Sequence, residues 1–128
     1  MATTYNLTLV RRNSMKIKVT AKKLVDGVET IIDLTGLTGS NIVYVVAKHP
    51  DAPDLVSLSI GLGITIVDAA NGRYDIDLTT THTDLPPEDY YHESTVVQGG
   101  QTMTDMIVIL TILKRLGEGD GDYEKKHT

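Results

Sequence analysis

The chain has 128 residues and a formal net charge of −5, and it contains no Cys, Phe or Trp. A chain of this length fits one domain that buries about two thirds of its unfolded surface, and the lack of Cys excludes disulfides, thiol nucleophiles and Cys-ligated zinc. No apolar stretch approaches the roughly 18 residues of a membrane span, and the polar first residues do not resemble a signal peptide, so we expect a soluble protein made in a cytoplasm.

Apolar and polar residues alternate with a period of two over most of the first half. Residues 5–9 and 15–21 show this pattern, which predicts half-buried strands. Asp26 and Gly27 predict a tight hairpin turn, because Gly accepts positive φ without steric cost. Residues 42–48 are apolar on both faces, which predicts a central strand covered on both sides. A loop with two prolines, residues 49–54, ends that strand.

The second half continues as short strands. Residues 55–60 and 64–67 favour strands, and Asn71-Gly72 predicts a turn into the alternating strand at 74–78. The last hairpin is expected from residues 90–97 and 106–113. By periodicity alone 106–113 could be a buried helix, but its length and β-branching favour a strand covered on both faces. About eight strands without an amphipathic helix predict an all-β fold, an antiparallel β-sandwich of about seven to eight strands.

We expect the chain to divide into an amino-terminal arm or strand at residues 1–12, the β-sandwich at 13–116 and a flexible acidic tail at 117–128. Residues 1–23 hold half of the chain's 12 basic side chains and none of its 17 acidic ones. A solvated basic strand is one interpretation, and a contact between subunits is another. Nucleic acid binding is a weaker third, because the rest of the chain is acidic and would repel phosphate.

Several short motifs occur in a suggestive order. Ile-Ile-Asp-Leu-Thr-Gly at residues 31–36 precedes the β-branched run at 42–47, Ala70-Asn-Gly-Arg-Tyr opens a later strand, and Leu85-Pro-Pro leads into Tyr90-Tyr91. Over residues 13–113 this order resembles the immunoglobulin-like domain of tailed-phage virion proteins, notably the amino-terminal domain of the upper baseplate protein of lactococcal phages. The chain departs from that family at Asn13-Ser14, where Gly-Asp is usual, and at residues 87–89, where a turn Gly is usual.

The resemblance implies an immunoglobulin-like sandwich and a non-enzymatic structural protein of a bacteriophage virion. Its place would be the baseplate, tail, neck or capsid surface, as an adaptor or decoration subunit assembled in the host bacterial cytoplasm. Its partners would be other virion proteins and further copies of itself, with no nucleic acid and no membrane. A carbohydrate-binding module for host recognition is the alternative, and it would need an exposed aromatic platform.

Specific residues follow from these interpretations. We expect the protein contact at the basic strand, and structural roles in the turns and at a corner where Tyr90 hydrogen-bonds back to the preceding loop. Ordinary core packing of Tyr90 is nearly as well supported. The contact residues are Arg11, Arg12, Lys16 and Lys18, and the structural residues are Asp33, Leu34, Thr35, Gly36, Asn71, Gly72 and Tyr90.

The sequence supplies no catalytic, cofactor-binding or metal-binding residue. His92-Glu93 begins like a zinc-protease motif but has no second His at position 96, and we expect the four histidines at the surface or in loops. Asp75 and Asp77 share one strand face and could serve glycoside hydrolysis or bind calcium, yet a solvated face explains them better. A small hydrolase would require His92, an Asp and a Ser to converge in one cleft.

Overall fold

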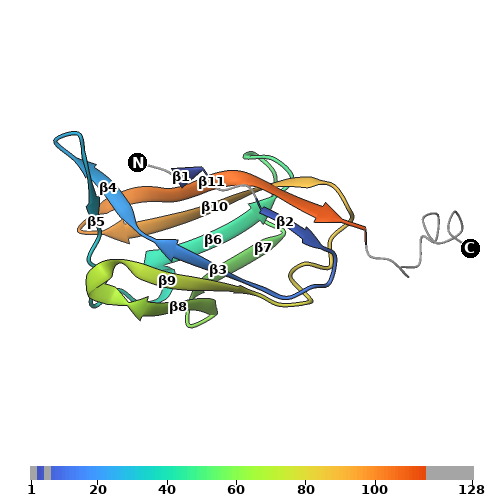
Figure 1. Ribbon diagram of the computed structural model, residues 1–128, viewed down its shortest axis with the longest axis horizontal. Helices are drawn as coiled ribbons and strands as arrows, with labels where there is room; N and C mark the ends of the chain where they lie inside the picture. Colours follow the sequence, from blue (N-terminus) through green and yellow to red (C-terminus); the bar gives the residue numbers. More distant parts are fainter. Residues whose placement is uncertain (1–2, 5–6, 115–128) are drawn as a thin grey trace, which may run out of the picture.

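The computed structural model describes residues 3–4 and 7–114, and these fold almost entirely into strands (Figure 1). No α-helix occurs in this part of the chain, and only two short 3-10 turns interrupt the strands, as the period-two pattern predicted. The strands are β1 (Thr3–Thr4), β2 (Leu7–Val10), β3 (Met15–Thr20), β4 (Lys22–Val25), β5 (Val28–Ile31), β6 (Ile42–Ala47), β7 (Val56–Ile60), β8 (Gly63–Asp68), β9 (Arg73–Leu78), β10 (Asp89–Gln98) and β11 (Gln101–Leu113); the 3-10 turns are η1 (Gly39–Asn41) and η2 (Ala69–Asn71).

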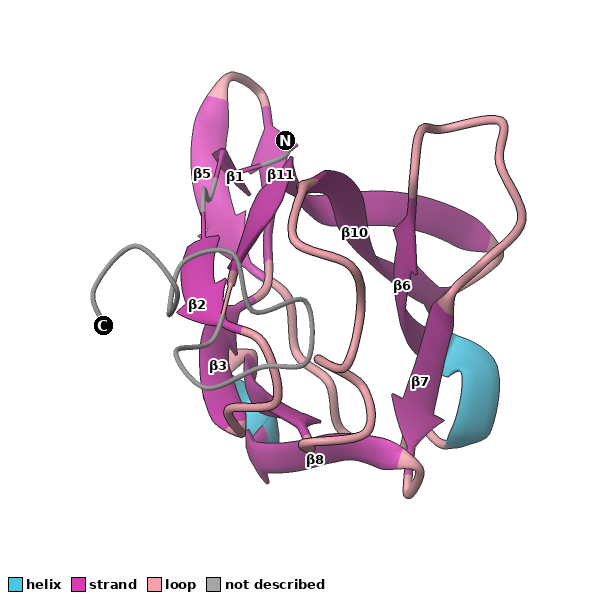
Figure 2. Ribbon diagram, turned by 90° about the vertical axis from the view of Figure 1, so that its right-hand side faces the viewer, coloured by secondary structure: helices cyan, strands magenta, loops and turns pink. Residues whose placement is uncertain are grey.

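Nine strands form one ladder in the order β1-β11-β10-β6-β7-β8-β9-β3, with β2 also paired to β11. The ladder curls on itself, so that β3 and β8 face β6, β7 and β10 across the interior (Figure 2). Strand β9 joins β8 to β3 in the ladder, and these two sides are the layers of a sandwich. Neighbours run antiparallel except for β1 and β2 on β11 and the two-residue pairing of β7 with β8, where the ladder passes between layers. Apart from β1 and the β4–β5 hairpin, eight strands make an immunoglobulin-like sandwich.

The core lies between the two layers. Alternate residues of the facing strands are buried there, and three tyrosines, Tyr44, Tyr74 and Tyr90, are its largest fully buried side chains. Because the chain has no Phe or Trp, these rings supply the aromatic bulk of the core. Each buried hydroxyl then needs a hydrogen-bond partner, and that requirement shapes the interior described below.

Residues 7–10, within the segment expected as an amino-terminal arm or strand, form a strand of the sandwich. Leu7 and Leu9 are 5% and 8% exposed and belong to the core. Their strand, β2, pairs in parallel with the end of β11, from Leu7 opposite Leu110 to Val10 opposite Leu113. This strand therefore belongs to one sandwich layer, while the tail expected at 117–128 lies outside the described residues.

The turns and the two apolar strands follow the sequence in part. Asp26 and Gly27 both have positive φ, 50° and 79°, as a two-residue hairpin turn requires. The segment at 106–113 is strand, part of β11, and not helix. The prediction that the strand at 42–48 is covered on both faces was wrong. No layer packs on the outer side of β6, and Val43 and Val45 remain half-buried there.

Candidate interaction surface

The β4–β5 hairpin, residues 22–31, projects from one end of the sandwich (Figure 1); we call it the projecting hairpin. Its strands pair only with each other, from Lys22 opposite Ile31 to Val25 opposite Val28. Four of its apolar side chains are exposed: Leu24 49%, Val25 43%, Val28 64% and Ile31 45%. An isolated two-stranded hairpin is marginally stable in water, so apolar exposure on both faces marks a surface suited to a protein contact.

Buried backbone hydrogen bonds hold the root of this hairpin. Ala21 and Ile32 flank it and are 0% and 1% exposed. The Ala21 amide donates to the Gly72 carbonyl at 2.7 Å, and the Ile32 amide donates to the Ala21 carbonyl at 2.9 Å. Gly72 has φ +68°, and a Cβ there would lie 2.7 Å from the Ile32 carbonyl oxygen. Only glycine fits this position without moving the backbone.

The Asp-Leu-Thr-Gly segment closes the same root from the other side. The Asp33 carboxylate accepts hydrogen bonds from the Thr35 amide at 2.9 Å and the Thr35 hydroxyl at 2.6 Å, and these hold the pKa of Asp33 below its usual value. Leu34 is fully buried, and its amide donates to the Ala69 carbonyl at 2.9 Å. The two turn motifs, separate in sequence, therefore meet where the projecting hairpin leaves the sandwich.

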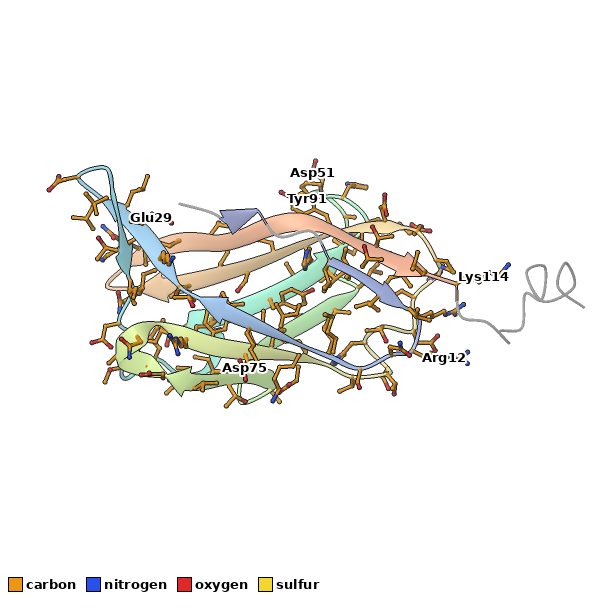
Figure 3. The ribbon with its side chains drawn as sticks, in the orientation of Figure 1. Arg12, Glu29, Asp51, Asp75, Tyr91 and Lys114 are labelled. Carbon is orange, nitrogen blue, oxygen red and sulfur yellow. The ribbon has the colours of Figure 1, made fainter. Side chains whose placement is uncertain are left out.

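Tyr90 makes the hydrogen bond expected of a corner tyrosine. Its hydroxyl donates to the Pro86 carbonyl at 2.6 Å, and the side chain is 1% exposed. Burial, together with the nearby Glu88 carboxylate, raises the pKa of Tyr90 to about 12. Tyr91 points to the outer face (Figure 3) and is half-buried, so it is the one tyrosine among the described residues that reaches the surface. The described surface thus lacks the aromatic platform of a sugar-binding site.

Two of the expected contact residues have an acidic partner within the chain. The Arg11 and Arg12 Nε atoms donate to one Asp84 carboxylate oxygen at 2.9 and 3.2 Å. These hydrogen bonds hold the pKa of Asp84 below its usual value, and the bond from Arg12 has the larger effect. All three side chains remain partly exposed, so the cluster still presents positive charge at the surface.

The other two contact residues lie on β3, which is an edge strand of the ladder. The Lys16 ammonium lies 3.8 Å from an Asp75 oxygen and 3.9 Å from an Asp77 oxygen. Lys18 makes no ion pair with the described residues. Their role in a contact stays a prediction, and of the two only Lys18 would bring positive charge that the described residues do not pair.

Asp75 and Asp77 occupy the outer face of β9, as the solvated-face interpretation expects. Hollows of about 510 and 360 Å³ lie beside them on the β3–β9 surface. Lys16 lies within 4 Å of both carboxylates, and Tyr74, which directly precedes Asp75 in the sequence, is buried on the opposite face. Among the described residues no group of three His, Asp or Glu side chains is placed to hold a metal ion.

The prediction that every histidine lies at the surface or in a loop was wrong for His92, which lies in β10. This side chain is 0% exposed, and its Nδ1 lies 2.9 Å from the Tyr44 hydroxyl, with the two rings edge to face. Burial raises the pKa of Tyr44 well above its usual value. His92 stands in phase with Tyr90 and Val96 along β10, and that alternation is the sequence signal for its burial.

The neighbouring inward residue on β10, Ser94, joins the two layers. Its hydroxyl oxygen lies 2.5 Å from the hydroxyl of Tyr74 on β9. Ser94 and Tyr74 are both 0% exposed. His92 and Ser94 are therefore close to each other but sealed in the core, and the open cleft that a hydrolase would need is not formed around them.

No family model and no curated protein matches this chain. Among solved structures it is similar to AggA, the major subunit of aggregative adherence fimbriae type I from Escherichia coli. That similarity covers 84% of this chain and 89% of the fimbrial chain, at 14% identity and a TM-score of 0.33. At this level of similarity the immunoglobulin-like assignment rests on the strand order itself. Within the described residues no helix is long and apolar enough to cross a membrane.

Proposed function

We propose that this protein is a non-catalytic structural subunit of a bacteriophage virion, at the baseplate, tail, neck or capsid surface, that acts through protein contacts. The observation that carries the contact role is the projecting hairpin, which exposes Leu24, Val25, Val28 and Ile31 to solvent. Burying such side chains against a neighbour is favourable, at about 25 cal/mol per Å² of apolar surface removed from water. The virion assignment draws on the motif order from residue 31 to Tyr91 and on the immunoglobulin-like sandwich.

The remaining chemistry of the chain supports a structural role. The buried polar groups described above pair with one another in the core, and Lys16 forms ion pairs with both carboxylates on β9. A host-glycan role, the alternative, would rest on stacking aromatics, and Tyr91 alone is a weak platform. Protein contact is accordingly the function we propose.

Immunogold labelling of purified phage particles tests the proposal. An antibody raised against the domain should label wild-type particles at a regular position and leave particles from a gene-deletion strain unlabelled. A companion strain carrying Leu24→Ser and Val28→Ser should lose the label, while a Val67→Ser strain, changed at a β8 residue that is 60% exposed, should keep it. Wild-type particles without label would refute the virion role, and normal labelling of the hairpin variant would refute the hairpin contact.

A further inference from the structure

The tip of the projecting hairpin and the opposite end of the molecule carry opposite charge. The distal half of the projecting hairpin holds the acidic residues Asp26 and Glu29, whereas its lysines, Lys22 and Lys23, lie at the root. Glu29 lies at one end of the long axis, and Arg12 and Lys114 lie at the other (Figure 3). The acidic hairpin tip and these basic residues therefore lie at opposite ends of the molecule.

The opposite end, which we call the basic end, consists of Arg11, Arg12, Leu113 and Lys114. The Arg11 amide donates to the Leu113 carbonyl at 2.9 Å, which joins the start of the β2–β3 turn to the end of β11. Two of its basic side chains, Arg11 and Arg12, share one carboxylate, that of Asp84. Leu113 is 45% exposed beside them. The basic end thus combines an exposed apolar side chain with basic ones, and the hairpin combines exposed apolar side chains with acidic ones toward its tip.

Backbone strain falls at these same two places. Among the described residues only two non-glycine residues have positive φ, Arg12 at 66° and Asp26 at 50°. Asp tolerates this conformation, but for Arg it costs about 1 kcal/mol or more, and Gly would relieve it. A strained residue whose side chain is charged and exposed points to a role for that side chain.

We propose that the projecting hairpin of one copy docks on the basic end of a second copy, head to tail. This inference rests on the proposed function for the assembly in which it operates. A heterologous contact of this kind repeats around a ring or along a filament. Ten residues supply less than the roughly 800 Å² per partner of a stable interface, so the contact is weak for an isolated pair and gains strength from repetition in an array.

Cysteine cross-linking of the purified protein tests the arrangement, because the natural chain has no Cys. Val28→Cys marks the hairpin and Leu113→Cys marks the basic end; Val67→Cys, at a β8 residue of similar exposure, is the matched control for Val28. Pairs of variants are mixed at about 1 mM each, where a contact with a millimolar Kd is populated to about 40%, and treated with a short bismaleimide. Val28→Cys mixed with Leu113→Cys should give a cross-linked dimer at about ten times the yield of Val67→Cys mixed with Leu113→Cys.

A second variant separates charge from folding. Arg12→Gly relieves the strained φ while removing the surface ion pair, so the domain should stay folded. Placed on the Leu113→Cys chain, it should lower the yield about threefold, as expected for one lost charge pair. Equal yields for Val28 and Val67, or a Val28→Cys homodimer as the main product, would overturn the head-to-tail contact. Since no particle is needed, this result stands apart from the immunogold outcome.

Discussion

Replacing Gly72 by Ala should be the most damaging single methyl addition in the described part of the chain. The left-handed φ of +68° costs a non-glycine residue about 1–2 kcal/mol. The new Cβ would also lie 2.7 Å from the Ile32 carbonyl oxygen and 2.9 Å from that of Ala21, and forcing such groups apart costs about 1–3 kcal/mol more. The expected loss is about 2–5 kcal/mol, out of the roughly 5–15 kcal/mol of a typical domain.

Gly61→Ala is the matched control for urea unfolding of the purified domain. Gly61 has φ +86°, and nothing lies within 4 Å of a Cβ built there. This variant should therefore lose stability only through its unfavourable backbone conformation. The entropy that Ala removes from the unfolded chain is the same in both variants and cancels in the comparison. If Gly72→Ala loses no more stability than Gly61→Ala, the Ala21–Ile32 root is not rigid, and the reasoning that anchors the projecting hairpin there fails.

Four further outcomes concern hydrogen bonds and ion pairs. Tyr90→Phe should lower the free energy of unfolding in urea by about 0.5–1.5 kcal/mol and Tyr91→Phe by clearly less; equal effects would leave only packing at the corner. Because the pKa of Tyr90 is raised from 10.0 to about 12, its neutral form stabilises the fold fully below pH 10, and that contribution should fade between pH 10 and 12 in alkaline melts. The pKa of Asp84 is lowered in the fold, so its carboxylate stabilises the fold above pH 3.8, the pKa of the unfolded chain, and this contribution is lost as the pH falls. Asp84→Asn should therefore be less stable than the wild type at pH 7. A stability difference that persisted at pH 2 would contradict the ion pair. Tyr74→Phe and Ser94→Ala should each cost about 1–3 kcal/mol, and the double variant should cost less than their sum; strict additivity would mean that the two hydroxyls do not interact.

The strands were predictable because their signal is local. Lys16, Lys18 and Thr20 alternate with Ile17 and Val19. An alternation with a period of two places the apolar residues on one face only if the backbone is an extended strand. The turn at Asp26-Gly27 was equally readable, since its residues accept positive φ. The corner tyrosine belongs to the same class, because its partner, Pro86, lies only four residues away.

The contact surface was less predictable. Leu24, Val25, Val28 and Ile31 are apolar, and a sequence gives no direct indication that nothing will cover them. Their order, with adjacent apolar residues just before a two-residue turn, places apolar groups on both faces of the hairpin, and that was the available signal. Whether both faces reach solvent depended on where the hairpin leaves the sandwich.

The sequence by itself determined the class of structure, the positions of most strands and turns, and the absence of thiol chemistry, because each depends on residue type or on neighbours a few positions apart. Tertiary structure decided which of those elements meet. It joined Asp33–Gly36 to Gly72 at one root, paired Arg11 and Arg12 with Asp84, and enclosed His92 and Ser94 between two layers. These contacts span tens of residues, and their energies depend on burial and on distances of a few ångströms, which only the packed chain defines.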